Sequence, residues 1–506
     1  ESDLAGALAA DILLDHFGPL AQRVAIVLLE RGELSLQQLL RFVNEEEDLM
    51  QEPLTFIQVR NALCVLLQHN LVAARPQVQE EQGRVVPQLY SIDLEEVLSR
   101  LRFSRYLEYV ECRYGRLAFQ IVFSVVRQGR VARSIVLLEV QQQCEEDASN
   151  DIDAKLIRLL KDDVLRVVRP YMVDQATSSA SKEEQAKTRG SKRKVPGGET
   201  EAPKGDPVYQ VNTQHLNLCL VKMLLCKQYE DMSHSISSTK ALATLLSEVV
   251  KSSGADEQTQ TQAGDSSADD RKHGKPKATV AAKNWLTFSA LVERMGELGY
   301  SEGRDNTREQ TDLRKSLDGL SSQQFGIVRK RGATLRGDTN AEWRIDWEEA
   351  TYQLKKSATS QLVRDRFGKA GLRIFNCLNN TVDPDRGDPQ KLEATHVART
   401  AAVEPTECRS ILNSMVRSHF VKLQQVAPAS NDEKDFNNSE WLYYVDRKPV
   451  ELTIIRDTLQ AILNLRVRAR TEVKSGARLD ALPVTNLTAE ERRKREQRWR
   501  MQDILE

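Results

Sequence analysis

The sequence lacks most of the patterns on which catalytic and metal sites are built. It has no Cys-x2-Cys pair, which excludes a zinc ribbon, and no glycine-rich loop of the kind that cradles phosphates. His16, His396 and His419 have no acidic or cysteine neighbour at catalytic spacing. We therefore expect no catalytic, cofactor-binding or metal-binding residues, no cofactor, and a chain that is not an enzyme.

Three further shortages limit the class of protein. Seven scattered cysteines argue against a disulfide framework and for a reducing compartment. No apolar run approaches the roughly 18 residues needed to cross a membrane, and the first residues do not form a secretion signal. Basic residues do not exceed acidic ones, since 72 Lys and Arg face 73 Asp and Glu. We expect a soluble nuclear or cytosolic protein that contacts no membrane and touches nucleic acid only through local patches.

The main feature that is present is a repeated helix that runs into a strand. Six apolar positions recur in three segments, and their spacing places the first four on one face of a helix. A fourth segment keeps four of these positions and fails at Ser321 and Gly326. The three full copies and the weaker fourth are residues 59–72, 152–165, 408–421 and 313–326.

Each copy is followed by two β-like runs with a polar loop between them, as in LVAAR and VVPQLYSI after the first. In the first two copies an earlier helix stops at a glycine, Gly32 or Gly129. The order helix, glycine turn, helix, helix and two-stranded wing is that of a winged helix. A helical solenoid is the alternative, and it is disfavoured because solenoid helices are not each followed by a pair of strands.

These observations predict a mainly α fold with small β wings, in which four tandem winged helices precede a C-terminal coiled-coil hairpin. Two low-complexity stretches, 174–207 in the second wing and 251–281 in the third module, should be mobile. The first of them contains the basic run SKRK (191–194), a weak candidate for a nuclear import signal. The predicted boundaries are 1–93, 94–211, 212–350 and 351–447 for the winged helices and 448–506 for the tail.

The tail carries a predicted seam for a partner helix, whose apolar residues step by 3, 4 and 3. Thr488 and Glu491 have the spacing of a capping box and open a second helix, which suggests the hairpin. That helix is still amphipathic at Glu506, so we expect the coiled coil to continue beyond it. The seam residues are Leu452, Ile455, Leu459 and Ile462.

Two basic patches are the candidate nucleic-acid contacts. Eight arginines lie between Leu98 and Arg133 and face only two glutamates, and the third wing carries a run of cations before Gly332. Such a patch could also be a solvated face or a face for an acidic protein. The repeated helix of the second module (152–165) is rich in Asp, which argues against base reading there. The candidates are Arg102, Arg105, Arg113, Arg116, Arg329, Lys330 and Arg331.

Four stretches together resemble a known family. ALCVLLQHNLV (62–72), RYLEYVECRYG (105–115), DRFGKAGLRIFNCL (365–378) and CRSILNSMVRSHFVKLQQV (408–426) are similar to the large subunit of the RNA polymerase III-specific initiation heterotrimer. The resemblance covers nearly the whole chain, although the linkers match nothing and the family's coiled coil continues further than Glu506. That family has four winged helices followed by a coiled coil.

The resemblance implies a nuclear, non-catalytic subunit of RNA polymerase III that helps to open the promoter. Its expected partners are the two other heterotrimer subunits, the clamp of the largest subunit, the initiation factor and promoter DNA bound without sequence preference. The alternative is a winged-helix scaffold subunit of a proteasome-lid-like or translation-initiation assembly. Such subunits usually carry one winged helix after a long helical array, whereas the repeat here recurs four times.

Overall fold

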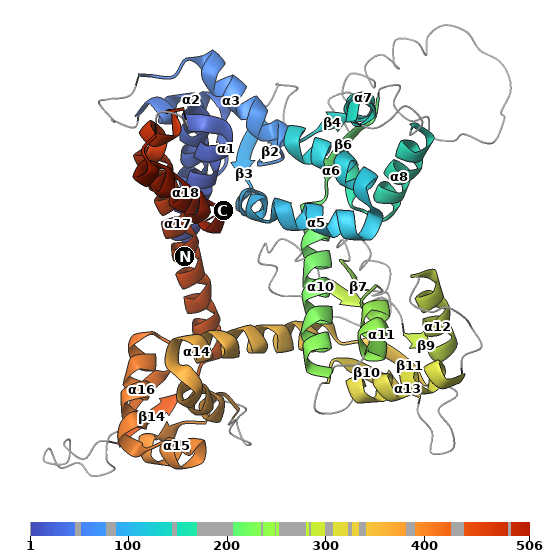
Figure 1. Ribbon diagram of the computed structural model, residues 1–506, viewed down its shortest axis with the longest axis vertical. Coiled ribbons are helices and arrows are strands. Elements are labelled where there is room, and N and C mark those ends of the chain that lie inside the picture. Colours follow the sequence, from blue (N-terminus) through green and yellow to red (C-terminus); the bar gives the residue numbers. More distant parts are fainter. Residues whose placement is uncertain are drawn as a thin grey trace, which may run out of the picture. The chain divides into compact units, whose positions relative to one another are not determined.

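The computed structural model describes residues 2–45, 52–76, 88–143, 149–168, 206–233, 236–247, 249–251, 280–282, 285–298, 307–321, 326–332, 341–380, 390–426, 440–483 and 487–505 (Figure 1). The chain divides into two compact units. Unit 1 comprises 1–220 and 465–506, and unit 2 comprises 221–464. The two predicted mobile stretches and the SKRK run lie outside the described residues, apart from 206–207 and 251 together with 280–281.

Unit 1 contains two similar sets of elements, which we call the first and second modules, and the chain's last helices. The first module consists of α1 (Ser2–Arg31), β1 (Leu34–Ser35), α2 (Leu36–Glu45), α3 (Phe56–Gln68), β2 (Val72–Pro76) and β3 (Gln88–Ile92). The second consists of α4 (Leu94–Ser99), the 3-10 turn η1 (Arg100–Arg102), α5 (Phe103–Tyr114), α6 (Arg116–Gln128), β4 (Val131–Ala132), α7 (Arg133–Gln143), α8 (Ser149–Lys161), β5 (Leu165–Val168) and β6 (Val208–Val211).

Unit 2 contains the third and fourth modules. After α10 (Thr213–Ser233), the third consists of α11 (Ile236–Ser247), β7 (Val249–Lys251), β8 (Val280–Ala282), β9 (Leu286–Thr287), α12 (Phe288–Glu297), α13 (Thr307–Ser321), β10 (Val328–Arg331) and β11 (Glu342–Ile345). The fourth consists of α14 (Trp347–Asn380), β12 (Leu392–Glu393), α15 (Ala394–Ala401), α16 (Pro405–Arg417), β13 (Lys422–Val426) and β14 (Glu440–Tyr444), followed by α17 (Arg447–Asp480) and α18 (Ala489–Leu505).

Every module has a small antiparallel sheet of three strands rather than the two predicted for a wing. The orders are β1-β3-β2, β4-β6-β5, β10-β11-β9 and β12-β14-β13. The extra strand immediately precedes a helix and is only two residues long in each case. A strand of two residues shows no alternation of apolar and polar side chains, so the pattern could not predict it. The mainly helical chain with these sheets is consistent with winged-helix domains.

The repeated segments share a helix ending as well as an apolar face. Asn70, Asp163 and His419 occupy the same place in the three full copies, and all three have positive φ, between 58° and 61°. The amide of the next residue donates to a carbonyl five residues back, with N–O distances of 2.9–3.0 Å. This is a Schellman ending, and Asn, Asp and His are residues that tolerate the left-handed conformation. The ending turns each helix directly into its strand.

Helix α1 is long and apolar enough, over Asp3–Arg31, to cross a membrane by length and composition alone. This corrects the expectation that no run approaches that length, because a helical window tolerates its few charged residues. The chain breaks helical geometry at Gly18, where φ is 82° and ψ is 177°. Leu8, Ile12 and Val24 of α1 are fully buried. The apolar residues of α1 therefore serve the core of the first module.

The second half of α17 contacts the first module through an ion cluster (Figure 1). Arg466 and Arg470 each pair with both Asp11 and Asp15 of α1, and the Nε of Arg466 lies 2.6 Å from Asp11. The side chain of Asp11 is only 9% exposed. Residues 465–506 thus pack with the first module, whereas the sequence suggested a separate tail.

Helix α18 contacts α17 at its second half. The Nη2 of Arg498 donates to the carbonyl oxygen of Glu472 at 3.0 Å and to Asp480 at 3.1 Å. The predicted capping box at Thr488 and Glu491 is confirmed, with hydrogen bonds of 2.8 Å and 3.3 Å between each backbone amide and the other side chain. These contacts fix where the second tail helix begins and against which part of α17 it lies.

The first and second modules meet at a tight backbone joint. The amide of Arg130 donates to the carbonyl oxygen of Gln68 at 2.8 Å, and the Nε of Arg130 donates to Asn70 at 2.6 Å. Gly129 precedes this contact with φ of 83° and ψ of −109°. A Cβ atom at Gly129 would lie 2.4 Å from the Gln68 oxygen, so only glycine fits there.

Replacement of Gly129 by alanine should loosen this joint. Gly32 is the matched control, because it has the same kind of positive φ, 81°, but no atom within 4 Å of the place that a Cβ would occupy. Gly32→Ala should cost about 1–3 kcal/mol of stability from backbone strain alone. Gly129→Ala should cost a further amount of about 1–3 kcal/mol from the clash. Equal losses of the two variants in calorimetric unfolding would contradict the tight contact.

Candidate nucleic-acid and partner interfaces

The candidate arginines of the second module are mostly engaged within the chain. The Nη1 of Arg102 donates to Asn217 at 2.8 Å, Arg105 pairs with Glu108 at 2.9 Å, and Arg116 pairs with Glu111 at 3.0 Å. Arg113 is exposed, and no carboxylate of the described chain lies within ion-pair distance of it. Of the four predicted contacts in this module, only Arg105 and Arg116 pair with a carboxylate, and Arg113 has no hydrogen-bond partner in the described chain either.

Each of the three predicted cations of the third wing has its own carboxylate. Arg329 lies 2.6 Å from Asp346, Lys330 lies 2.8 Å from Asp318, and Arg331 lies 2.6 Å from Glu342. The guanidinium of Arg331 also lies over the ring of Trp285, at 4.3 Å from its centroid. The structure therefore brings the three predicted residues together on β10, but it also neutralises their charge.

A further group of cations, which we did not predict from the sequence, lies on α14. The stretch 355–373 of α14 contains six basic residues and one acidic residue, a local excess that a scan for charge would have found. Lys355 and Arg366 pair with Glu451 and Asp457 of α17, at 2.9 Å and 3.0 Å. In the part of the chain that the structure describes, the remaining four have no carboxylate within ion-pair distance. They are Lys356, Arg364, Lys369 and Arg373.

The predicted seam residues lie on one side of α17 and are only partly covered by the described chain. Leu452 is 49% exposed and Ile455 is 50% exposed, while Leu459 and Ile462 are half-buried. The opposite side of the helix is buried through Val450 and Thr453. Exposed branched side chains at this spacing are typical of a surface that receives another helix.

Helices α3 and α8, which correspond to the recognition helices of DNA-binding winged helices, expose apolar side chains. On α3, Phe56 is 46% and Ile57 is 60% exposed, and Val65 is 40% exposed. On α8, Ile157 is 66% exposed. Base reading needs polar groups at these positions, so the apolar faces favour contact with protein.

An arginine and two histidines lie close together where the first and second modules meet. The Nη1 of Arg100 lies 3.2 Å from Nδ1 of His16, and its guanidinium lies 4.5 Å from the ring centroid of Phe17. The ring of His69 packs 4.9 Å from the ring of Phe17. Burial, and after it the Arg100 charge, lower the pKa of His69 to about 4. Burial likewise lowers the pKa of Arg100 to about 10 and the pKa of His16.

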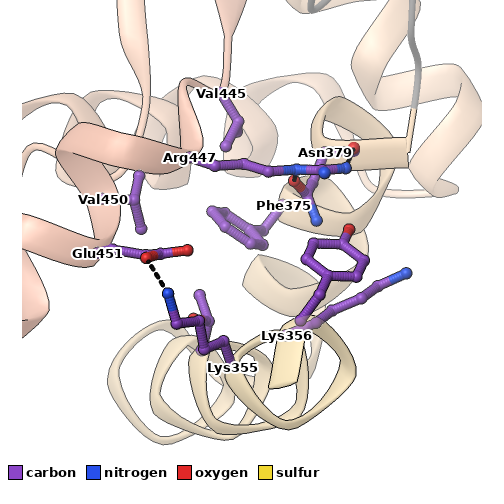
Figure 2. Close-up of a pocket in the computed structure, with 10 residues that line it drawn as sticks. Lys355, Lys356, Phe375, Asn379, Val445, Arg447, Val450 and Glu451 are labelled. Carbon is purple, nitrogen blue, oxygen red and sulfur yellow. Dashed lines mark hydrogen bonds and ion pairs between the residues drawn. The ribbon is translucent and has the colours of Figure 1, made fainter. Parts of the chain in front are cut away.

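A small pocket lies in unit 2 between α14, α17 and the residues after β14 (Figure 2). Its apolar lining comes from Phe375, Val445 and Val450, which are buried. Three cations line it as well. Lys355 is paired with Glu451, and Nε of Arg447 donates to Asn379 at 3.1 Å. The pocket is lined by Tyr352, Lys355, Lys356, Thr359, Phe375, Asn379, Val445, Arg447, Val450 and Glu451.

Comparison with known proteins gives matches to one kind of protein. Residues 7–76 match the RNA polymerase III subunit RPC82 helix-turn-helix domain. The chain is 23% identical to RNA polymerase III subunit RPC3 of Homo sapiens over 502 residues, which cover 93% of the chain and 85% of the relative. The subunit of Rattus norvegicus is 21% identical over 516 residues, with the same coverage. A match to the Dictyostelium discoideum subunit, 23% identical over 182 residues, covers 35% of the chain and 26% of that relative.

The chain is similar to RNA polymerase III subunit RPC3 along most of its length. The resemblance seen in the sequence is thereby confirmed, and homology to RPC3 supports a role as a subunit of that polymerase. The RPC82 domain match spans α1 to β2, so the apolar face of α3 and His69 of the joint belong to the matched region.

Acid should open the joint between the first and second modules. The unfolded chain binds a proton at His69 near its ordinary pKa of 6.5, whereas the folded chain binds it only near pH 4. Stability is therefore complete above about pH 6.5 and falls as the pH drops toward 4. Hydrogen exchange of segments 66–71 and 125–130, measured at about pH 7 and about pH 5 and corrected for intrinsic rates, should show this loss. His69→Gln should reduce the pH dependence, and His396→Gln, which removes an exposed histidine, should not.

Proposed function

We propose that the chain is a non-catalytic subunit of nuclear RNA polymerase III that helps to open the promoter and start transcription. The similarity to RPC3 over 93% of the chain carries this proposal. In it, the four modules act as tandem winged helices, and α17 and α18 form a coiled-coil hairpin. The domain boundaries predicted from the sequence are kept, except that residues 465–506 work together with the first module.

Protein contacts supply most of the binding in this proposal. The exposed apolar faces of α3 and α8 and the seam of α17 would receive the two heterotrimer partners, the clamp of the largest subunit and the initiation factor. An exposed apolar surface of this kind gains free energy when another protein covers it. The relatives described above give no support to the scaffold alternative, because all of them are named as RNA polymerase III subunits.

The first test is assembly. A tagged full chain should recover the large RNA polymerase III subunits and two small partner subunits from nuclear extract. Ile57→Asp, which places a charge on the exposed face of α3, should lower the recovery without changing the melting temperature. Gln37→Asp on α2 provides the same charge at another exposed position and should have no effect. Recovery of proteasome-lid or ribosome-associated proteins without the polymerase would contradict the proposed function.

DNA contact in this proposal is independent of sequence and comes from the candidate cations, with Arg113 foremost. Arg113→Gln should weaken binding of a duplex and lower the slope of log affinity against log salt by about 1. Arg331→Gln should have a smaller effect, because Glu342 already neutralises Arg331. Glu342→Gln should instead strengthen binding by releasing that charge. Equal effects of Arg113→Gln and Arg331→Gln would show that the ion pair does not matter, and no effect of either would exclude both patches.

A further inference from the structure

The pocket in unit 2 holds two cations that lack a carboxylate. Its wall contains Lys355, Lys356 and Arg447, but only one acidic side chain, Glu451, which pairs with Lys355 at 2.9 Å. Arg447 uses Nε and Nη2 for Asn379 and lies over the ring of Tyr352, at 4.9 Å from its centroid. Within the described residues, no carboxylate reaches Lys356 or Arg447. The pocket is therefore bordered by two cations for which the described chain provides no carboxylate.

The shape and lining of the pocket favour a carboxylate on a short apolar stem. The pocket is small and combines an apolar lining with cations, which suits a short side chain that ends in an anion. Figure 2 shows Phe375 between Arg447 and Lys355. This ring and the buried Val450 would contact methylene groups, whereas Arg447 still has Nη1 available for a carboxylate oxygen. A glutamate or aspartate side chain meets both conditions.

The pocket borders the exposed seam of α17. At about 100° per residue, the four seam residues lie within an arc of about 80° on the helix. Glu451 lies about 20° outside that arc and Arg447 about 60° outside it, both on the same side. A helix placed along Leu452 and Ile455 would therefore pass beside the pocket. Its apolar residues would cover the seam, and an acidic residue at its edge could enter the pocket.

Farther along α17, the same face is already used by a helix. Arg466 and Arg470 fall in the arc defined by the seam residues. There they bind Asp11 and Asp15, which are four residues apart on α1 and therefore share a face. Around these aspartates α1 carries apolar residues such as Ile12. In its second half, this face of α17 thus binds an amphipathic helix whose carboxylates pair with arginines of α17.

We propose that the seam of α17 binds an amphipathic helix of a partner subunit, which inserts a glutamate or aspartate between Lys356 and Arg447. This inference rests on the proposed function, because it takes the partner from among the RNA polymerase III subunits. The apolar contact supplies most of the affinity, and the carboxylate sets the register of the helix along the seam. Charge complementarity and continuity with the α1 contact both select this occupant.

The test uses the full chain and RNA polymerase III from which the corresponding subunit has been removed. Ile455→Glu should weaken assembly by about 30-fold or more, because it puts a charge at the centre of the contact. Lys356→Gln and Arg447→Gln should each weaken it by about threefold to tenfold and make it less sensitive to salt. Leu362→Glu and Arg364→Gln, exposed positions of α14 outside the pocket, are the matched controls. Circular dichroism and melting temperature verify that every variant folds.

A photo-crosslinker at Leu452 identifies the occupant. The expected product is a peptide of another polymerase subunit with apolar residues at spacings of three and four and a neighbouring acidic residue. Replacement of that acidic residue by Lys should restore assembly of Arg447→Glu. Crosslinks to DNA, or to a segment without such an acidic residue, would overturn the inference. Unchanged assembly of Ile455→Glu and Arg447→Gln would overturn it while leaving the proposed function intact, and a wild-type chain that does not assemble would overturn both.

Discussion

The ion cluster that joins α1 to α17 is the constraint on which the arrangement of unit 1 depends. Two arginines from one end of the chain bind two aspartates from the other, and Asp11 is almost fully buried there. Removal of one partner from a buried pair leaves a charge in a poorly solvated place, at a typical cost of about 3–5 kcal/mol. The cluster therefore favours this position of α17 on α1, in which all four charges are paired.

This docking changes the role of the tail. A free coiled coil would present its apolar stripe along the whole length, whereas α17 has its second half committed to the first module and to α18. The seam of the first half stays partly exposed, and it lies next to a pocket with uncompensated cations. Apolar side chains of the second half, such as Val467 and Val473, are exposed as well.

The repeats could be predicted from the sequence because they depend only on residues close together in the chain. The apolar face of each repeated helix needs the same spacing, and the Schellman ending needs a residue such as Asn70 or Asp163 that tolerates positive φ. The third strand of each sheet was missed because two residues carry no period. The docking of the tail was missed because Arg466 and Asp11 are 455 residues apart and nothing local connects them.

The candidate DNA contacts were harder to predict than the fold, because some of their ion-pair partners come from other elements of the chain. A run of cations such as Arg329 to Arg331 signals positive charge, but the charge available to DNA depends on partners that folding brings in. Glu342 lies directly opposite Arg331 in the sheet and could have been found from the strand register, whereas Asp318 comes from α13 and could not. The excess of basic residues on α14 is less affected by folding, because four of its six cations have no carboxylate within ion-pair distance in the described chain.

Ion pairs of this kind also bear on the DNA contact that we propose for a chain with a net charge of −1. A cation that already pairs with a carboxylate adds little to DNA binding, because its neutralised charge releases few counterions. In the function that we propose, weak contact without sequence preference would suit a subunit that holds different promoters and then lets them move. Specificity would then come from the apolar faces of α3, α8 and α17, which would select protein partners by shape. Position on the polymerase, rather than affinity for DNA, would bring unpaired cations such as Arg113 to the nucleic acid.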